Sequence, residues 1–131
     1  MMSCSSKDPV DLLLEELEEA TENRDVDAFT KKVTSDFTAN DQIGREEALT
    51  MLRRYFLAYE RITIDVTNVE RLKTGTRVNF DVSFSGNVNE AFQLQNIIPS
   101  TAAYHFDLRL AQEDEQLKIQ KAYWKEIPSG F

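Results

Sequence analysis

The chain is poor in side chains that bind soft metals or form disulfides, with one cysteine and one histidine in 131 residues. A single cysteine cannot form a disulfide within this chain, and no cysteine–histidine cluster has the spacing of a zinc site. We therefore expect no metal and no cofactor. Any nucleophile that depends on a histidine has to use His105.

Positive charge is also scarce, since 15 Lys and Arg oppose 23 Asp and Glu, for a net charge of −8. A nucleic-acid partner needs a clustered basic face, whereas Lys31–Lys32 and Arg53–Arg54 are isolated pairs on predicted helices. No apolar run approaches the roughly 20 residues of a membrane span. The composition is typical of a soluble globular domain that does not bind nucleic acid, and its length predicts one domain with a substantial core.

Cys4 is followed by Ser5 and Ser6 in a polar stretch that we interpret as a disordered tether, residues 1–7. This resembles the start of a mature bacterial lipoprotein, although only residues 1–3 precede the cysteine, with no basic or apolar region of a signal peptide. Two interpretations stay open. Cys4 is lipidated in a cell-envelope protein whose signal was trimmed, and contacts a membrane only through that lipid. Alternatively, it is an ordinary thiol in the frayed terminus of a cytoplasmic protein.

The first half of the chain predicts three helices. Asp8 and Pro9 are typical of a helix start, and an apolar stripe follows at Val10, Leu13, Leu14, Leu17 and Ala20. Asp25 caps a second helix, and Gly44 begins a third that continues to residue 59. Between these helices, residues 35–40 read as a short edge strand or extended segment with Phe37 pointing inward.

From Arg61 the apolar period changes to two, which predicts four strands between residues 61 and 127, with a β-bulge near Thr67–Asn68 and a turn at 73–75. One face of the sheet is apolar. The other is polar and carries Arg77, Asn79, Asp81, His105, Asp107 and Arg109, with Trp124 at the same parity. Helices followed by an antiparallel meander indicate the α+β class, with N-terminal helices packed on one face of the sheet.

Several local motifs occur in this order: Asp25 to Phe29, Asp36–Phe37, the helix start Gly44 to Ala48, and Tyr123–Trp124. The pattern resembles the nuclear transport factor 2-like superfamily, the cystatin-like cone shared by SnoaL-type cyclases and ketosteroid isomerases. The resemblance covers residues 8–127 as one domain, followed by a tail at 128–131. It implies a strongly curved sheet and a cone-shaped pocket lined by Leu17, Phe37, Leu52, Tyr55, Phe56, Phe80, Phe84, Tyr104, Phe106 and Tyr123.

Two functions from different classes fit this resemblance. The first is a non-catalytic module that binds a small apolar ligand or a protein. The second is a small isomerase, cyclase or dehydratase that uses Asp36 and a pocket tyrosine, Tyr55 or Tyr104. A third possibility is that the aromatic side chains simply fill the core.

Charges of both signs alternate on the polar sheet face, which predicts a homodimer that pairs arginines with aspartates, with Trp124 as its aromatic anchor, and the resemblance points the same way. The alternative is a solvated sheet face on which Trp124 covers neighbouring side chains. The long segment 87–101 is expected to form a lid over the pocket or a contact with a second subunit, or else an irregular element at the sheet edge.

Overall fold

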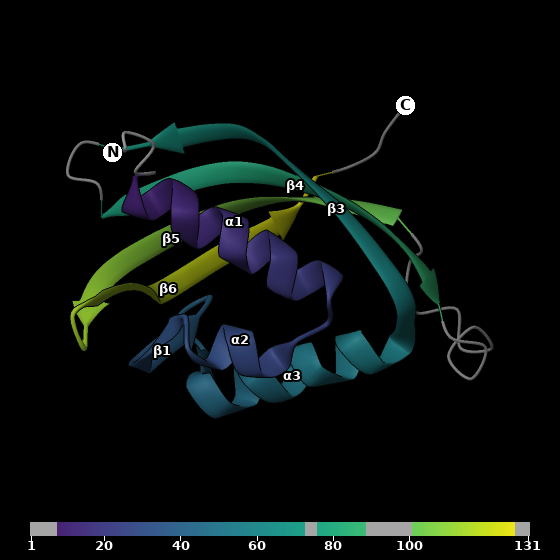
Figure 1. Ribbon diagram of the computed structural model, residues 1–131, viewed down its shortest axis with the longest axis horizontal. Helices are drawn as coiled ribbons and strands as arrows, with labels where there is room; N and C mark the ends of the chain where they lie inside the picture. Colours follow the sequence, from purple (N-terminus) through teal and green to yellow (C-terminus); the bar gives the residue numbers. More distant parts are fainter. Residues whose placement is uncertain (1–7, 73–75, 89–100, 128–131) are drawn as a thin grey trace, which may run out of the picture.

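The computed structural model describes residues 8–72, 76–88 and 101–127. The helices are α1 (Pro9–Glu22), α2 (Val26–Thr30) and α3 (Arg45–Ala58). The strands are β1 (Val33–Ala39), β2 (Ile43–Gly44), β3 (Tyr59–Arg71), β4 (Arg77–Val88), β5 (Thr101–Glu113) and β6 (Gln116–Glu126). The predicted order of helices around one extended segment, followed by four long strands, is confirmed (Figure 1).

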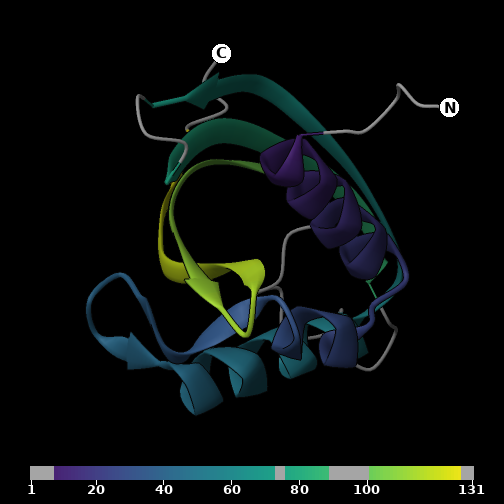
Figure 2. The same ribbon diagram turned by 60° about the vertical axis from the view of Figure 1, so that its left-hand side comes forward.

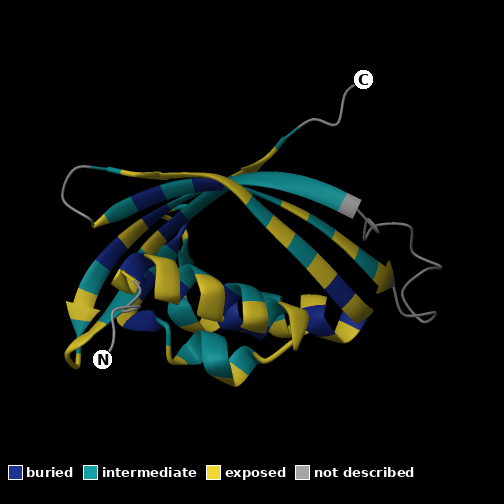
Figure 3. Ribbon diagram, turned by 45° about the horizontal axis from the view of Figure 1, so that its top comes forward, coloured by how far each residue is buried: buried dark blue, intermediate teal, exposed yellow. Residues whose placement is uncertain are grey.

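The helices begin where the sequence predicts them. Asp8 caps α1 by accepting a hydrogen bond from the N–H of Val10 at 2.8 Å, and Asp25 caps α2 by accepting one from the N–H of Ala28 at 3.2 Å. Gly44 is the N-cap of α3. On α1 the buried positions are Val10, Leu13, Leu17 and Ala20. The rest of this helix is more exposed, so it packs through one face (Figure 3).

The strands form one curved, unclosed sheet of six strands in the order β2-β1-β6-β5-β4-β3. The sequence predicts an antiparallel sheet with an edge strand at 35–40. Most pairs are antiparallel, but β1 pairs in parallel with β6 and lies between β6 and β2, away from the edge. Phe37 is buried as predicted, with 8% of its surface exposed. The sheet curves around the helices, and α1 packs inside the curve (Figures 1 and 2).

Two irregularities change the register of neighbouring strands. The β3–β4 pairing shifts between Thr67 and Glu70, with Asn68 at φ 54°, which confirms the predicted bulge. A second shift, not predicted from the sequence, occurs in the β5–β6 pairing, where Arg109 pairs with Lys121 and Leu110 with Ile119. Gln120 is therefore an extra residue in β6, and the side chains after it point to the opposite face from the one that simple alternation predicts.

The buried side chains form two clusters. The larger one joins α1 and β1 to the sheet and includes Val10, Leu13, Leu17, Val33, Phe37, Ala39, Val78, Phe80, Leu108, Leu110, Ile119 and Ala122. The smaller one lies where α3 runs into β3 and consists of Phe56, Ala58, Tyr59 and Ile62. Phe29 packs against both clusters. The two clusters are therefore joined through Phe29.

Several predictions lie outside the described residues. These are the tether 1–7 with Cys4, the turn at 73–75, the tail 128–131, and residues 89–100 of the segment 87–101. Strands β4 and β5 extend to the edges of that last gap. Of the helices in the described ranges, none is long and apolar enough to cross a membrane.

Candidate functional site

A row of aromatic rings crosses the concave face of the sheet from the smaller cluster to the larger one. The ring centroids of Tyr59 and Phe84 lie 5.6 Å apart, those of Phe84 and Tyr104 6.5 Å, and those of Tyr104 and Phe106 6.3 Å. Phe106 then contacts Phe80 at 5.5 Å and Trp124 at 5.9 Å. We call this set, Tyr59, Phe84, Tyr104, Phe106, Phe80 and Trp124, the aromatic row.

Strand register places these rings on the same face. Phe80 on β4 pairs directly with Phe106 on β5, which pairs with Trp124 on β6. Directly paired residues on neighbouring strands point to the same side and have their Cβ atoms about 5 Å apart. Phe80 and Phe106 therefore stack with only 7° between their planes, and Phe84 and Tyr104, one diagonal step away, stack at 14°.

The first ring of the row is held by a close approach to a glycine. An alanine Cβ at Gly86 would lie 2.8 Å from Cδ1 of Tyr59 and 2.9 Å from the carbonyl oxygen of Arg61. Only glycine fits there without a shift of the ring or the strand. Gly86 thus allows the Tyr59 ring to approach β4 closely and to meet Phe84 edge-on at 90°.

The rings are not equally buried. Tyr59 and Phe80, at the two ends, are 2% and 6% exposed and fill the clusters on either side. Phe84, Tyr104, Phe106 and Trp124 are only half-buried. Phe106 and Trp124 also pack against the larger cluster and Phe84 against the smaller one, but each keeps part of its surface exposed, which a flat apolar ligand can cover.

Tyrosine hydroxyls gather at the end of the aromatic row next to α3. Burial raises the pKa of Tyr59 to about 12, with smaller contributions from the neighbouring Tyr104 and Tyr55. Burial also raises the pKa of Tyr104, and Tyr55 and Glu126 add to the shift. These hydroxyls stay protonated near neutral pH, so they are suited to hydrogen bonding with a ligand rather than to acting as bases.

Asp36 does not join these tyrosines, which corrects the predicted acid–base pair. Its carboxylate accepts hydrogen bonds from Thr34 at 2.7 Å and from Gln120 at 3.1 Å, and these bonds, Thr34 first, lower its pKa. Asp36 thus lies beside Gln120, whereas Tyr104 pairs with Glu126 on the same strand. These two positions of β6 are about 20 Å apart at the usual rise per residue. Asp36 is therefore an exposed carboxylate that links β1 to β6, far from Tyr104.

Tyr123 and Trp124 lie on the faces opposite to the predicted ones. Trp124 pairs with Phe106 and belongs to the aromatic row, whereas Tyr123 pairs with Asp107 on the outer face. There the guanidinium carbon of Arg109 lies 5.6 Å from the centroid of the Tyr123 ring. The extra residue Gln120 is the cause, because it reverses the alternation of β6 before these aromatic residues.

The remaining predicted pocket residues divide between three environments. Leu17, Phe37 and Phe80 belong to the larger cluster, and Phe56, with Leu52 packed on it, to the smaller one. Phe84, Tyr104 and Phe106 are in the aromatic row, and Tyr55 is 50% exposed on α3. Sequence reasoning missed Trp124 and Gly86 as site residues. A glycine inside an alternating strand is the signal that indicates such a close approach.

The polar outer face carries the predicted charged residues, and four of them form two pairs within the chain. Arg77 donates two hydrogen bonds to Asp107, at 3.0 and 2.7 Å. Nδ1 of His105 lies 2.7 Å from Asp81, whose pKa is lowered by hydrogen bonds from Asn68 first and then from His105. The single histidine is thus held on the face opposite to the aromatic row. Within the described ranges, no three His, Cys, Asp or Glu residues are grouped to hold a metal ion.

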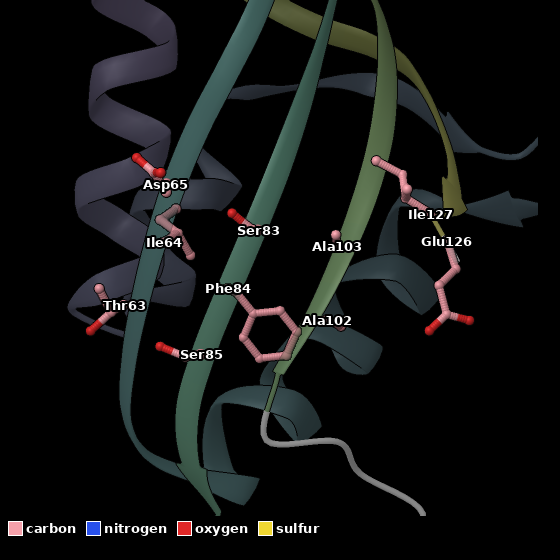
Figure 4. A pocket seen from close by; sticks show the side chains of 10 residues that line it. All are labelled: Thr63, Ile64, Asp65, Ser83, Phe84, Ser85, Ala102, Ala103, Glu126 and Ile127. Atoms are coloured by element: carbon pink, nitrogen blue, oxygen red, sulfur yellow. The ribbon is translucent and has the colours of Figure 1, made fainter. Parts of the chain in front are cut away.

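A hollow of about 430 Å³ is lined by residues of β3, β4 and β5 and by the end of β6 (Figure 4). Its lining includes the small polar side chains of Thr63, Ser83 and Ser85, which alternate with the concave-face residues along β3 and β4. Phe84 and Glu126 line it as well, so the hollow reaches the end of the aromatic row. Ile127, beyond the end of β6, closes it on the other side.

Comparison with known proteins supports the fold. No protein-family model matches the sequence, and no curated protein matches it. Among solved structures, a SnoaL-like polyketide cyclase from Agrobacterium tumefaciens is 15% identical over 93% of both chains, with a TM-score of 0.67. An uncharacterized protein with a cystatin-like fold from Caulobacter vibrioides is 10% identical over 92% of this chain and 89% of that one, with a TM-score of 0.67.

A third similar structure, Bd1075 from Bdellovibrio bacteriovorus, is 11% identical over 92% of this chain, with a TM-score of 0.70, but this chain spans only 40% of its length. The α+β cone of the nuclear transport factor 2-like, or cystatin-like, fold predicted from the sequence is therefore confirmed. At these identities the similarity describes the fold and not the chemistry.

Proposed function

We propose that the chain is a non-catalytic binding module that holds a small, flat, mostly apolar ligand against the aromatic row. The observation that carries this proposal is the run of half-buried rings at Phe84, Tyr104, Phe106 and Trp124, all on one face. Parallel rings on neighbouring strands form a platform on which a further ring can stack. The tyrosine hydroxyls at one end supply hydrogen bonds that orient the ligand.

The positions of the acidic and basic groups favour binding over catalysis. Proton transfer needs a base within hydrogen-bond reach of the ligand, with its pKa near the working pH. The carboxylate of Asp36 is remote from the tyrosines and has a lowered pKa, and His105 lies on the outer face with Asp81. The proposed module therefore releases its ligand unchanged.

Binding of 1-naphthol, a neutral flat probe, tests this proposal. We expect it to change the fluorescence of Trp124, the only tryptophan, in a saturable manner. Tyr104→Ala is expected to weaken binding about 2- to 10-fold, because one aromatic stacking contact contributes about 0.5–1.5 kcal/mol. Tyr104→Phe keeps the ring and is the matched control. Equal affinity for the alanine variant and the wild type, or no saturable binding at all, contradicts the proposal.

We also propose a homodimer formed through the outer face, with Tyr123 in place of Trp124 as its aromatic anchor. The hollow beside Ser83 offers space for side chains of a second copy. Arg109 and Tyr123 together present a flat, rigid surface.

Sedimentation velocity at micromolar concentration is expected to show a dimer for the wild type and a folded monomer for Tyr123→Glu. The substitution places a charge on the proposed anchor, and desolvating that charge opposes association. Trp124→Phe alters the concave face instead and should leave the dimer intact. A monomeric wild-type protein, or a dimer sensitive to Trp124→Phe and insensitive to Tyr123→Glu, is inconsistent with this assembly.

A further inference from the structure

The end of the aromatic row next to α3 combines exposed aromatic surface with a carboxylate. Glu126 on β6 pairs directly with Tyr104 on β5, so both side chains point to the concave face. Tyr55 on α3 is 50% exposed and lies close enough to influence both Tyr59 and Tyr104. Phe84 stacks against Tyr104 on the other side. We call Phe84, Tyr104, Tyr55 and Glu126 the acidic aromatic end.

The charged group that acts on Tyr104 at the acidic aromatic end is negative. The groups that raise the pKa of Tyr104, besides burial, are Tyr55 and the carboxylate of Glu126. Of the nearby basic residues, Arg24 is occupied and Lys125 faces away, whereas Arg53 and Arg54 are exposed on α3 next to Tyr55. Nη1 of Arg24 donates a hydrogen bond to the carbonyl oxygen of Tyr59 at 2.7 Å, and Lys125 pairs with His105 on the outer face. The whole chain carries a net charge of −8, which adds a long-range attraction for cations.

We infer that the acidic aromatic end binds an organic cation, a protonated or quaternary amine whose flat apolar body lies along the aromatic row. This inference rests on the proposed function and specifies its ligand as a small soluble molecule. A cation over the faces of Tyr and Phe rings is attracted by the ring quadrupoles, and Glu126 supplies the opposing charge. An anionic ligand at the same place would meet the carboxylate, so charge complementarity selects the cation.

Two probes of nearly the same shape separate charge from hydrophobicity. Phenyltrimethylammonium is a quaternary cation. tert-Butylbenzene is its neutral analogue, with a carbon atom in place of the nitrogen. Titration followed by the fluorescence of Trp124 is expected to give at least about 5-fold tighter binding of the cation at low salt. Glu126→Gln is expected to weaken binding of the cation about 3- to 10-fold and to leave tert-butylbenzene unchanged. The control is Glu115→Gln, which removes the same charge at the exposed turn between β5 and β6.

The outcomes distinguish this inference from the proposed function. If tert-butylbenzene binds as tightly as the cation while 1-naphthol still binds, the cation preference is overturned and the binding module remains. If none of the three probes binds, both are overturned. If Glu115→Gln weakens cation binding as much as Glu126→Gln, the attraction comes from net charge alone, and Glu126 has no specific role. If Glu126→Gln weakens both probes equally, it acts on the structure of the site, which also overturns the inference.

Discussion

Replacing Phe80 with alanine is expected to lower the free energy of unfolding by about 3–5 kcal/mol. Phe80 is 6% exposed and lies in the larger cluster, with its ring stacked on Phe106 at 5.5 Å. Removing it leaves a cavity between α1 and the sheet, because strand β4 is hydrogen-bonded on both sides and cannot collapse into the space. Leu17→Ala, on the helix side of the same cluster, is expected to cost about 2–5 kcal/mol.

Urea denaturation followed by circular dichroism measures both changes. Glu19→Ala is the matched control on α1, because Glu19 lies on the exposed side of the same helix and its replacement should cost under about 0.5 kcal/mol. The loss in free energy of unfolding is therefore expected to be largest for Phe80→Ala, smaller for Leu17→Ala and much smaller for Glu19→Ala. Similar losses for Leu17 and Glu19 would mean that α1 does not pack through the face described here.

Local patterns predicted the elements of the fold well, because each depends on residues close in sequence. The cap at Asp8 and the helix start at Gly44 have a side-chain or glycine signal at the site itself. The bulge at Asn68 is indicated by the slip in the apolar period at Val69 and Leu72. The alternation on β4 and β5 placed Phe80 and His105 on opposite faces, as observed. Where one face of a strand is clearly apolar, burial fixes the register and the prediction holds.

The register of the final strand, β6, could not be predicted from the sequence. Leu117 and Ile119 suggest an alternation that puts Tyr123 inside, but the extra residue Gln120 reverses it and brings in Ala122 and Trp124 instead. A bulge at a polar residue carries no composition signal of its own. The extra residue can be identified only from the pairing of β6 with β5, which shows that Gln120 has no pairing partner on β5.

The sequence predicted which types of residue form the candidate site better than it predicted how they are arranged. Phe84, Tyr104 and Phe106 do share one face, as the alternation indicates. The pair of Asp36 with a tyrosine was wrong because it depended on long-range strand order. β1 pairs with β6 through the stretch near Gln120, which places Asp36 at the far end from Tyr104. No local period in the sequence reports on such a parallel pairing.

Replacing Gly86 with serine is expected to destabilise the protein by about 1–3 kcal/mol, since the added Cβ overpacks the strand. The Cβ would lie 2.8 Å from the Tyr59 ring and 2.9 Å from the carbonyl oxygen of Arg61. The ring can turn aside, but the carbonyl belongs to the paired strand β3 and can move only with the ladder. The loss of stability is therefore steric. In a Tyr59→Leu background the clash with the ring is removed but the clash with the carbonyl oxygen of Arg61 remains, so Gly86→Ser should still destabilise the protein, by a smaller amount.

Gly44→Ser is the matched control, because a Cβ at Gly44 meets nothing within 4 Å and serine is a favourable N-cap for α3. Thermal and urea unfolding should show a loss for Gly86→Ser and no loss for Gly44→Ser. The displaced Tyr59 ring also loses its edge-on contact with Phe84, so Gly86→Ser should weaken 1-naphthol binding while the protein remains folded. Equal stability of the two serine variants would show that Gly86 does not hold the first ring of the aromatic row in place.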